Sequence, residues 1–180
     1  FLDAWRTGGG EPLAAIGIAS FGPVDLKPGS ARWGFITDTP KPYWQNTDIG
    51  GFIRRRYGVP VGFDTDVNGA GLGELRWGAC AGCDVFVYLT VGTGIGGGLF
   101  VHGEPVHGLV HTEMGHMRLP HDHAHDPYDG CCPFHGDCLQ GLASGLAISQ
   151  RWGAPAEGLP VDHPGWDLEA DYLALACANL

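Results

Sequence analysis

The chain has 180 residues, 44% of them hydrophobic, and a formal net charge of −10. This composition predicts a soluble globular protein with one sizeable core or two small lobes, and it excludes disordered and fibrous classes. With only 10 lysines and arginines, the chain is poorly suited to bind nucleic acid over a broad surface. It also has no apolar run of about 18 residues, the length needed to span a membrane. The first residues also lack the basic start and apolar block of a secretory signal.

Two short apolar segments in the first third of the chain predict buried strands. Residues 13–20, LAAIGIAS, end just before Gly22 and Pro23, as expected for a strand that leads into a functional turn. Residues 59–64 form the second segment. Between the two strands, residues 29–48 carry prolines, aromatic and polar residues without a period, which predicts a loop.

Helices are predicted beside these strands and at the end of the chain. Residues 49–58, IGGFIRRRYG, can be capped by Thr47 or Asp48, and residues 67–77 read as a helix despite their glycines. The first residues resemble a helix tail, and residues 167–180 have an amphipathic helical pattern without a cap. We therefore expect a fragment that lacks both ends of a longer protein.

The middle of the chain predicts a β-hairpin followed by a long loop. Residues 84–91, DVFVYLTV, are rich in β-branched and aromatic side chains, and a glycine turn leads to a second short strand at residues 98–101. A turn is predicted at residues 102–105. Residues 108–141 are loop-like and rich in histidine, and a helix is expected to begin near Leu142.

The glycine turn of this hairpin is a candidate phosphate site. Gly92, Gly94 and Gly97 satisfy G-x-G-x-x-G, but a dinucleotide fold needs a helix after that motif, and here a strand follows. The chain also lacks the Gly-Lys-Ser/Thr of a P-loop. The bare backbone, with the Thr90 and Thr93 hydroxyls beside it, can still form a nest of N–H donors for phosphate. The alternative is a flexible hairpin that binds nothing.

A carboxylate follows the second predicted strand. The segment FDTDVNGAGLGE places Asp64, Asp66 and Asn68 at the strand end, where ligands gather in α/β sheets. Asp66 can accept the proton of a sugar hydroxyl and orient that oxygen toward a phosphoryl group. The alternative is that Asp66 only caps the following helix, which aspartate commonly does.

The cysteines point to a metal rather than to disulfides. They are clustered unevenly, whereas disulfide frameworks belong to smaller secreted chains, so we expect a reducing, cytoplasmic setting. Cys132, His135 and Cys138 supply three zinc ligands in Cys-x2-His-x2-Cys spacing, and a closed tetrahedral site needs a fourth. Inert thiols in a loop are the alternative. The candidates for the fourth ligand are His116, His121, His123, His125 and Cys131.

The histidine-rich tract HDHAHDPYD, residues 121–129, raises the question of a second metal. It does not match the H-x-H-x-D-H order of dinuclear hydrolases. We expect a solvated acidic loop there, with a catalytic metal as the weaker reading.

Several motifs occur together in one order: GIASFGPVDL, TPKPYWQNTD, FDTDVNGAGLGE, YLTVGTGIGGG, HTEMGH and CPFHGDCLQGLASG. Together they resemble the ROK family of sugar kinases and regulators, and most closely its zinc-containing bacterial fructokinases. The resemblance covers about residues 15–145. It implies an α/β actin-like ATPase (ribonuclease H-like) fold in two lobes. Residues 1–64 would belong to the small N-terminal lobe and residues 65–180 to the large lobe, with a zinc-binding loop at residues 108–141.

The resemblance also implies roles for individual residues. Asp66 takes the position of the catalytic base. The phosphate loop would hold ATP through Thr90, Gly92, Thr93, Gly94, Gly96 and Gly97. The sugar would be contacted by Gly22, Pro23, Thr65, Glu113, His116 and Gln140. The segment TPKPYW, residues 39–44, would also line the sugar cleft, with Thr39, Trp44 and Asn46 assigned there less firmly. Structural zinc would be held by His116, Cys132, His135 and Cys138. The second ring nitrogen of His116 would then be free to meet a sugar hydroxyl.

The implied activity is transfer of a phosphoryl group from ATP to a hexose, most specifically D-fructose at its 6-hydroxyl, with Mg²⁺ on the nucleotide. A homodimer without nucleic-acid or membrane partners is expected. The chain departs from the family pattern in three ways. It has Cys-x2-His-x2-Cys in place of the common C-x-C-G-x-x-G-C zinc motif, which favours the fructokinase subgroup. Gln140 and Thr65 stand where Glu and Asn are usual, and the N-terminal D-x-G-G-T loop is absent. The rivals are a sugar-sensing transcriptional regulator of the same family and a zinc-dependent hydrolase.

Overall fold

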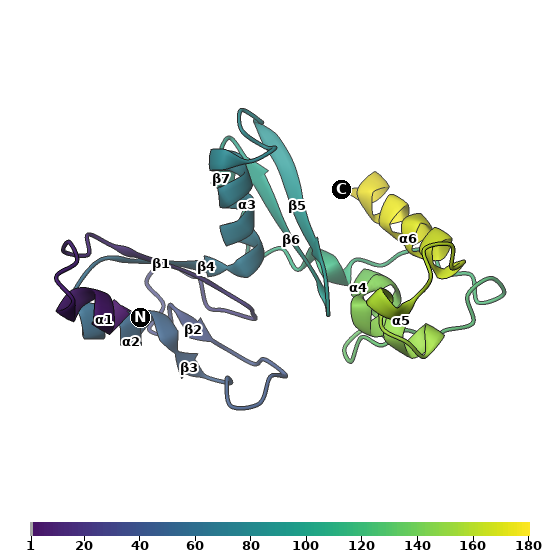
Figure 1. The fold of residues 1–180 in the computed structure, drawn as a ribbon, viewed down its shortest axis with the longest axis horizontal. Helices are drawn as coiled ribbons and strands as arrows, with labels where there is room; N and C mark the ends of the chain where they lie inside the picture. Colours follow the sequence, from purple (N-terminus) through teal and green to yellow (C-terminus); the bar gives the residue numbers. More distant parts are fainter. Residues whose placement is uncertain (1) are drawn as a thin grey trace.

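The computed structural model describes residues 2–180 and alternates strands with helices, as expected of an α/β protein (Figure 1). The N-terminal part contains α1 (Leu2–Thr7), β1 (Ile16–Ser20), β2 (Phe35–Ile36), β3 (Thr47–Asp48), α2 (Ile49–Tyr57) and β4 (Val61–Thr65). The central part contains α3 (Asp66–Trp77), β5 (Val85–Val91), β6 (Ile95–Val101), β7 (Glu104–Pro105) and the 3-10 helix η1 (Met114–His116). The last part contains α4 (Leu139–Ala143), α5 (Gly145–Trp152), the 3-10 helix η2 (Ala156–Gly158) and α6 (Gly165–Asn179).

The two predicted buried strands pair in parallel, β1 with β4, with Ser20 opposite Thr65 at the end of the ladder. This register sets the turn after β1 beside the start of α3. Val24, Ile36 and Phe63 form the buried core beneath these strands. Asp48 caps α2 by accepting a hydrogen bond from the Gly51 N–H, so of the two predicted caps Asp48 is correct.

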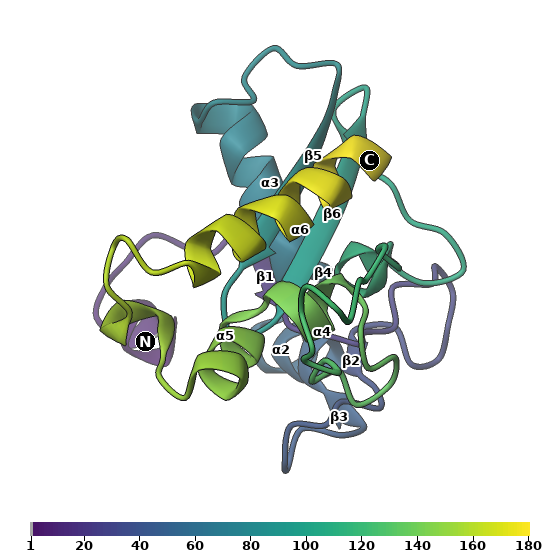
Figure 2. The same ribbon diagram turned by 90° about the vertical axis from the view of Figure 1, so that its right-hand side faces the viewer.

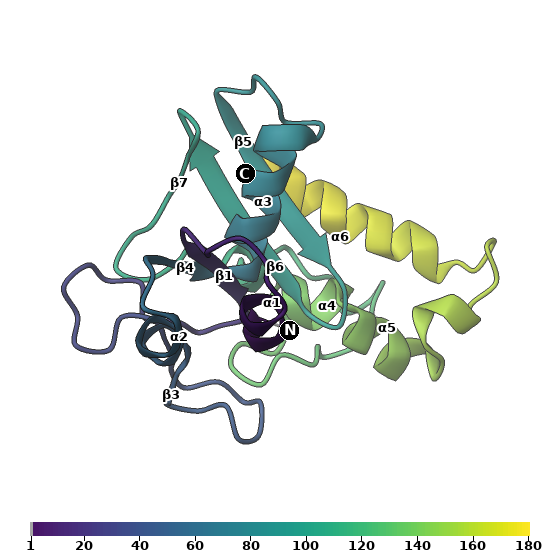
Figure 3. The ribbon, with the colours of Figure 1, turned by 60° about the vertical axis from the view of Figure 1, so that its left-hand side comes forward.

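The hairpin of β5 and β6 is the centre of the molecule. Its strands are antiparallel, with Val91 opposite Ile95 across the glycine turn, and α3 packs against them. The packing is close, because a Cβ at Gly71 of α3 would lie 2.3 Å from the Phe100 ring. Seen from two directions, the hairpin and α3 lie between the N-terminal strands and the C-terminal helices (Figures 1 and 3).

The C-terminal helices enclose a second core with a buried charge network. Leu139 and Leu142 of α4 are fully buried against α6, which runs past α4 in Figure 2. Arg151 of α5 donates to Asp126 at 2.9 and 3.1 Å and to Glu169 of α6 at 3.3 Å. The arginine therefore ties a loop and two helices together.

The structure corrects three sequence-based expectations. The second hairpin strand spans Ile95–Val101, longer than predicted, because its glycines pair in register with β5. The helix predicted near Leu142 begins at Leu139 as α4. The histidine tract is not simply a solvated loop, since the side chains of His121 and Asp126 are 3% and 2% exposed. No helix within residues 2–180 is both long and apolar enough to cross a membrane.

Candidate active site and metal cluster

A cavity of about 420 Å³ opens where the turn after β1, the start of α3 and the hairpin turn meet. The cavity is lined by every residue to which the sequence firmly assigns a catalytic, sugar or nucleotide role: Gly22, Pro23, Thr65, Asp66, Thr90, Gly92, Thr93, Gly94, Gly96, Gly97, Glu113, His116 and Gln140. Three less firmly assigned residues are not among those that line it. They are Thr39, which is buried, Trp44, which packs edge-on against Phe21, and Asn46, whose side chain accepts from Arg32.

Asp66 is exposed to this cavity at the first position of α3. The helix is capped by Thr65, whose hydroxyl accepts from the Asn68 N–H at 3.2 Å, so the reading of Asp66 as the cap is wrong. Asp66 accepts one hydrogen bond, from the neighbouring Val67 N–H at 2.9 Å. Its second carboxylate oxygen is thus available to a ligand within the described residues.

In the glycine turn, some backbone groups are hydrogen-bonded and others have no partner within residues 2–180. The Gly92 N–H donates to the Gly94 carbonyl at 2.9 Å, and the Gly92 carbonyl accepts from the Gly145 N–H at 2.7 Å. The Thr93 and Gly94 N–H groups have no acceptor in residues 2–180. Two adjacent open donors in a turn suit an anion such as phosphate.

Gln140 supports this turn from α4. Its Oε1 accepts from the Ile95 N–H at 3.1 Å, and a Cβ at Gly94 would lie 2.8 Å from the same oxygen. A side chain at Gly94 would therefore displace Gln140. The amide found where the family usually has glutamate still supplies the acceptor that the turn uses.

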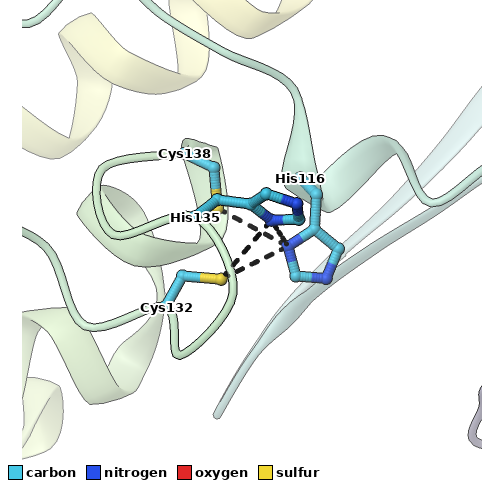
Figure 4. A group of neighbouring side chains, drawn as sticks. All are labelled: His116, Cys132, His135 and Cys138. Atoms are coloured by element: carbon cyan, nitrogen blue, oxygen red, sulfur yellow. Dashed lines mark hydrogen bonds between the residues drawn. The ribbon is translucent and has the colours of Figure 1, made fainter.

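Four side chains form a compact cluster beside the cavity: His116 of η1 with Cys132, His135 and Cys138 of the following loop (Figure 4). The His116 Nδ1 is 3.5 Å from each sulfur and 3.2 Å from the His135 Nδ1, which is 3.7 Å from the Cys132 sulfur. Tetrahedral zinc bonded at about 2.0 Å to nitrogen and about 2.3 Å to sulfur would require N···N near ~3.3 Å and N···S near ~3.5 Å.

The cluster thus has both the donor set and the spacing of a closed, structural zinc site. Burial and the nearby Cys132 thiol raise the pKa of Cys138 to about 11, so a divalent cation would be needed to hold it as a thiolate at neutral pH. Among the alternative fourth ligands, none of His121, His123, His125 or Cys131 joins the cluster within residues 2–180.

Glu113 connects the cluster to the cavity. Its Oε2 is 3.7 Å from the His116 Nε2, and its Oε1 is 2.5 Å from the His111 Nε2. The His111 hydrogen bond is the main cause that lowers the pKa of Glu113, and burial lowers the pKa of His116. Glu113 has a φ of 48°, a left-handed conformation that is uncommon for a non-glycine residue and is often found at functional sites.

Sequence reasoning missed several residues of the cavity wall. They are Phe21, Val67, Ile95, His111 and Phe134. His111 carried a usable signal, because it stands in HTEMGH, two residues before Glu113. Pro40 and Lys41 also line the cavity and belong to the predicted segment TPKPYW.

Known proteins of one family match this chain in sequence and in fold. Residues 6–165 match the ROK family. The chain is 54% identical over 144 residues to a fructokinase from Zymomonas mobilis, covering 79% of this chain and 48% of that protein. It is 41% identical over 170 residues to a fructokinase from Pediococcus pentosaceus, covering 94% of this chain and 59% of that protein. The chain thus spans about half the length of these curated relatives.

A solved structure shows the same architecture. The ROK hexokinase from Thermus thermophilus superposes with a TM-score of 0.74 at 29% identity, over 99% of this chain and 61% of that one. The fold is therefore the α/β fold of ROK sugar kinases, within the actin-like ATPase class. The chain belongs to the ROK family.

Proposed function

We propose that the protein transfers the γ-phosphoryl group of ATP to the 6-hydroxyl of D-fructose, producing fructose 6-phosphate and ADP. The observation that carries this proposal is that two kinds of residue line one cavity. They are Asp66 and the turn residues Thr93 and Gly94, whose N–H groups have no acceptor in residues 2–180. A proton acceptor and a phosphate cradle are the two parts that phosphoryl transfer to an alcohol requires.

In the proposed reaction, Asp66 accepts the proton of the sugar hydroxyl as that oxygen bonds to the γ-phosphorus. The bond from the γ-phosphorus to the bridging oxygen breaks, and ADP leaves. The turn amides stabilise charge on the phosphate oxygens as it develops. Mg²⁺ would enter with ATP and neutralise part of the phosphate charge. Glu113 and His116 would contact the sugar.

Zinc, held by His116, Cys132, His135 and Cys138, has a structural role in this proposal. Four protein ligands leave no open position for a reactive water, which argues against the hydrolase alternative. The metal would fix the loop that carries Glu113 and His116. In the same proposal the full-length protein is a cytoplasmic homodimer, an expectation that rests on the family resemblance.

The choice of fructose rests on the relatives. The two curated proteins described above are named fructokinases. Glucose and mannose differ from fructose by hydroxyl positions that a few side chains can distinguish, and the cavity of this chain does not by itself select among them.

The test is a coupled ADP-release assay of the full-length protein with a panel of hexoses. We expect ADP release to be fastest with fructose and to stop when ATP is omitted. A protein that binds a hexose but releases no ADP with any of them would support the regulator alternative and overturn the kinase proposal. Preference for another hexose would retain the kinase but reject fructose.

A further inference from the structure

We infer that His111 is a positioning residue for the sugar site, holding the Glu113 carboxylate in the orientation that receives sugar hydroxyls. This inference rests on the proposed function, because it assigns a role within that same cavity. His111 lies outside the residues that the sequence motifs assigned to the sugar, although it lines the cavity.

The His111 ring contacts both Glu113 and the turn after β1 at the edge of the cavity. Its side chain is 10% exposed, and its Nε2 is 2.5 Å from the Glu113 Oε1. A Cβ at Gly22 would lie 3.2 Å from the same Nε2 and 3.3 Å from Cε1, so the turn after β1 packs against this end of the ring. The ring therefore fills the space between the loop that carries Glu113 and the Gly22–Pro23 turn after β1.

The carboxylate needs such a partner. Glu113 sits in the left-handed backbone region, and its side chain is 44% exposed, so backbone and packing alone do not fix the carboxylate. Its other oxygen, Oε2, is 3.7 Å from the His116 Nε2, beyond ordinary hydrogen-bond distance. Within residues 2–180, His111 is thus its one close hydrogen-bond partner, which leaves Oε2 open toward a ligand.

The hydrogen bond to Glu113 also fixes the His111 ring. The His111 Nδ1 is buried and has no hydrogen-bond partner among residues 2–180, so the Nε2 bond to Glu113 sets the orientation of the imidazole. Losing that bond would free the carboxylate to rotate. A freely rotating carboxylate loses sugar affinity, because the ordering cost must then be met on binding.

The experiment compares two substitutions at His111 in the full-length, zinc-loaded protein. His111→Gln keeps an N–H donor near the position of Nε2, whereas His111→Leu fills similar space without a donor. We expect His111→Leu to raise the KM for fructose about tenfold or more, the range for a lost hydrogen bond to a charged group, with the KM for ATP changed by less than about twofold. His111→Gln should recover most of the sugar affinity.

His102→Gln is the matched control, because His102 is 76% exposed and pairs with Asp84 at the far end of the hairpin. It should leave both KM values unchanged. Melting temperature and zinc content are measured for every variant. If His111→Leu does not fold, His111→Asn replaces it, since asparagine is polar but one methylene too short to reach Glu113, and the same loss is expected.

Two results would overturn the inference. One is a donor-free variant with the wild-type KM for fructose. The other is equal impairment of His111→Gln and His111→Leu, which would assign the effect to ring volume. If the wild-type protein releases no ADP with any hexose, the proposed function fails instead. The same variants are then compared by calorimetric titration with fructose, where an unchanged Kd in His111→Leu would reject the positioning role.

Discussion

At the scale of single residues, the structure separates two carboxylates that stand two positions apart. Asp64 accepts from the Asn68 amide at 2.8 Å and is 2.9 Å from the His107 Nε2, so its oxygens are occupied. Asp66 faces the cavity. The difference arises because Asp64 is still within β4, whereas Asp66 is the first residue of α3.

Replacing Asp66 by asparagine should remove the proton acceptor while preserving shape. We expect kcat of the full-length protein to fall by about 10²–10⁴-fold, the usual contribution of general base catalysis, with zinc content and melting temperature retained. The measurement is ADP release with fructose at saturating ATP. Asp84→Asn, at an exposed carboxylate away from the cavity, is the control. Full activity in Asp66→Asn would remove the proposed mechanism.

Local sequence signals were sufficient for some residues of the site and insufficient for others. Asp66 and the glycine turn follow strands with clear patterns, so they could be located from neighbouring residues alone. His111 stands in the HTEMGH motif beside Glu113, but its packing against Gly22, which is distant in sequence, could not be predicted from neighbouring residues. Thr65, and not Asp66, caps α3, so the capping alternative for Asp66 is wrong; both are good capping residues, and only the strand boundary distinguishes them.

At the scale of elements, strands and helices with strong periodicity were predictable, while burial in the histidine tract was not. The Asp126 carboxylate is buried because it pairs with Arg151, which comes from a helix 25 residues later in the chain. Arg151 also contacts Glu169 of α6. From sequence alone, a tract rich in histidine and aspartate is predicted to be exposed to solvent, because the arginine that pairs with its buried carboxylate lies far along the chain.

This network gives stability a defined dependence on pH. Burial is the main cause that raises the pKa of Glu169 to about 7, although Arg151 opposes the shift. The folded state then binds more protons than the unfolded state between about pH 4.5 and 7, so this group lowers the free energy of unfolding as pH rises through that window. The shift corresponds to a loss on the order of 3 kcal/mol.

Glu169→Gln mimics the protonated acid and should flatten this dependence. We expect the variant to match the wild type near pH 5 and to exceed its free energy of unfolding near pH 8. The measurement is urea unfolding at a series of pH values, with Glu157→Gln, in an exposed 3-10 turn, as control. Identical wild-type and Glu169→Gln profiles would show that burial does not shift this carboxyl group.

At the scale of the whole molecule, one cavity draws its walls from segments far apart in the chain. The turn after β1, the start of α3, the hairpin turn and the loop around η1 all contribute. The cluster of His116, Cys132, His135 and Cys138 shares His116 with this last wall. Loss of order in the metal-binding loop should therefore change the position of the side chains that line the cavity.

Removal of the metal tests this arrangement. We expect one zinc ion per chain, and chelation should lower the free energy of unfolding by about 4 kcal/mol, as for a ligand present at about a thousand times its Kd. Hydrogen exchange should increase over residues 108–141. Cys132→Ser should lose the metal, whereas Cys131→Ser, one position away and outside the cluster, should keep it. Equal metal content in the two variants would reject the assigned ligand set.

The imidazole of His116 presents Nδ1 to the cluster and Nε2 to Glu113. Because one ring contacts both the metal cluster and the sugar site, binding of a metal ion and binding of a hexose would affect each other, and this coupling is reciprocal. If the bound ion raises the affinity for the hexose by some factor, the bound hexose must raise the affinity for the ion by the same factor. If the proposed function is right, saturating hexose would then lower the free zinc concentration at which the cluster holds its ion, compared with the sugar-free protein.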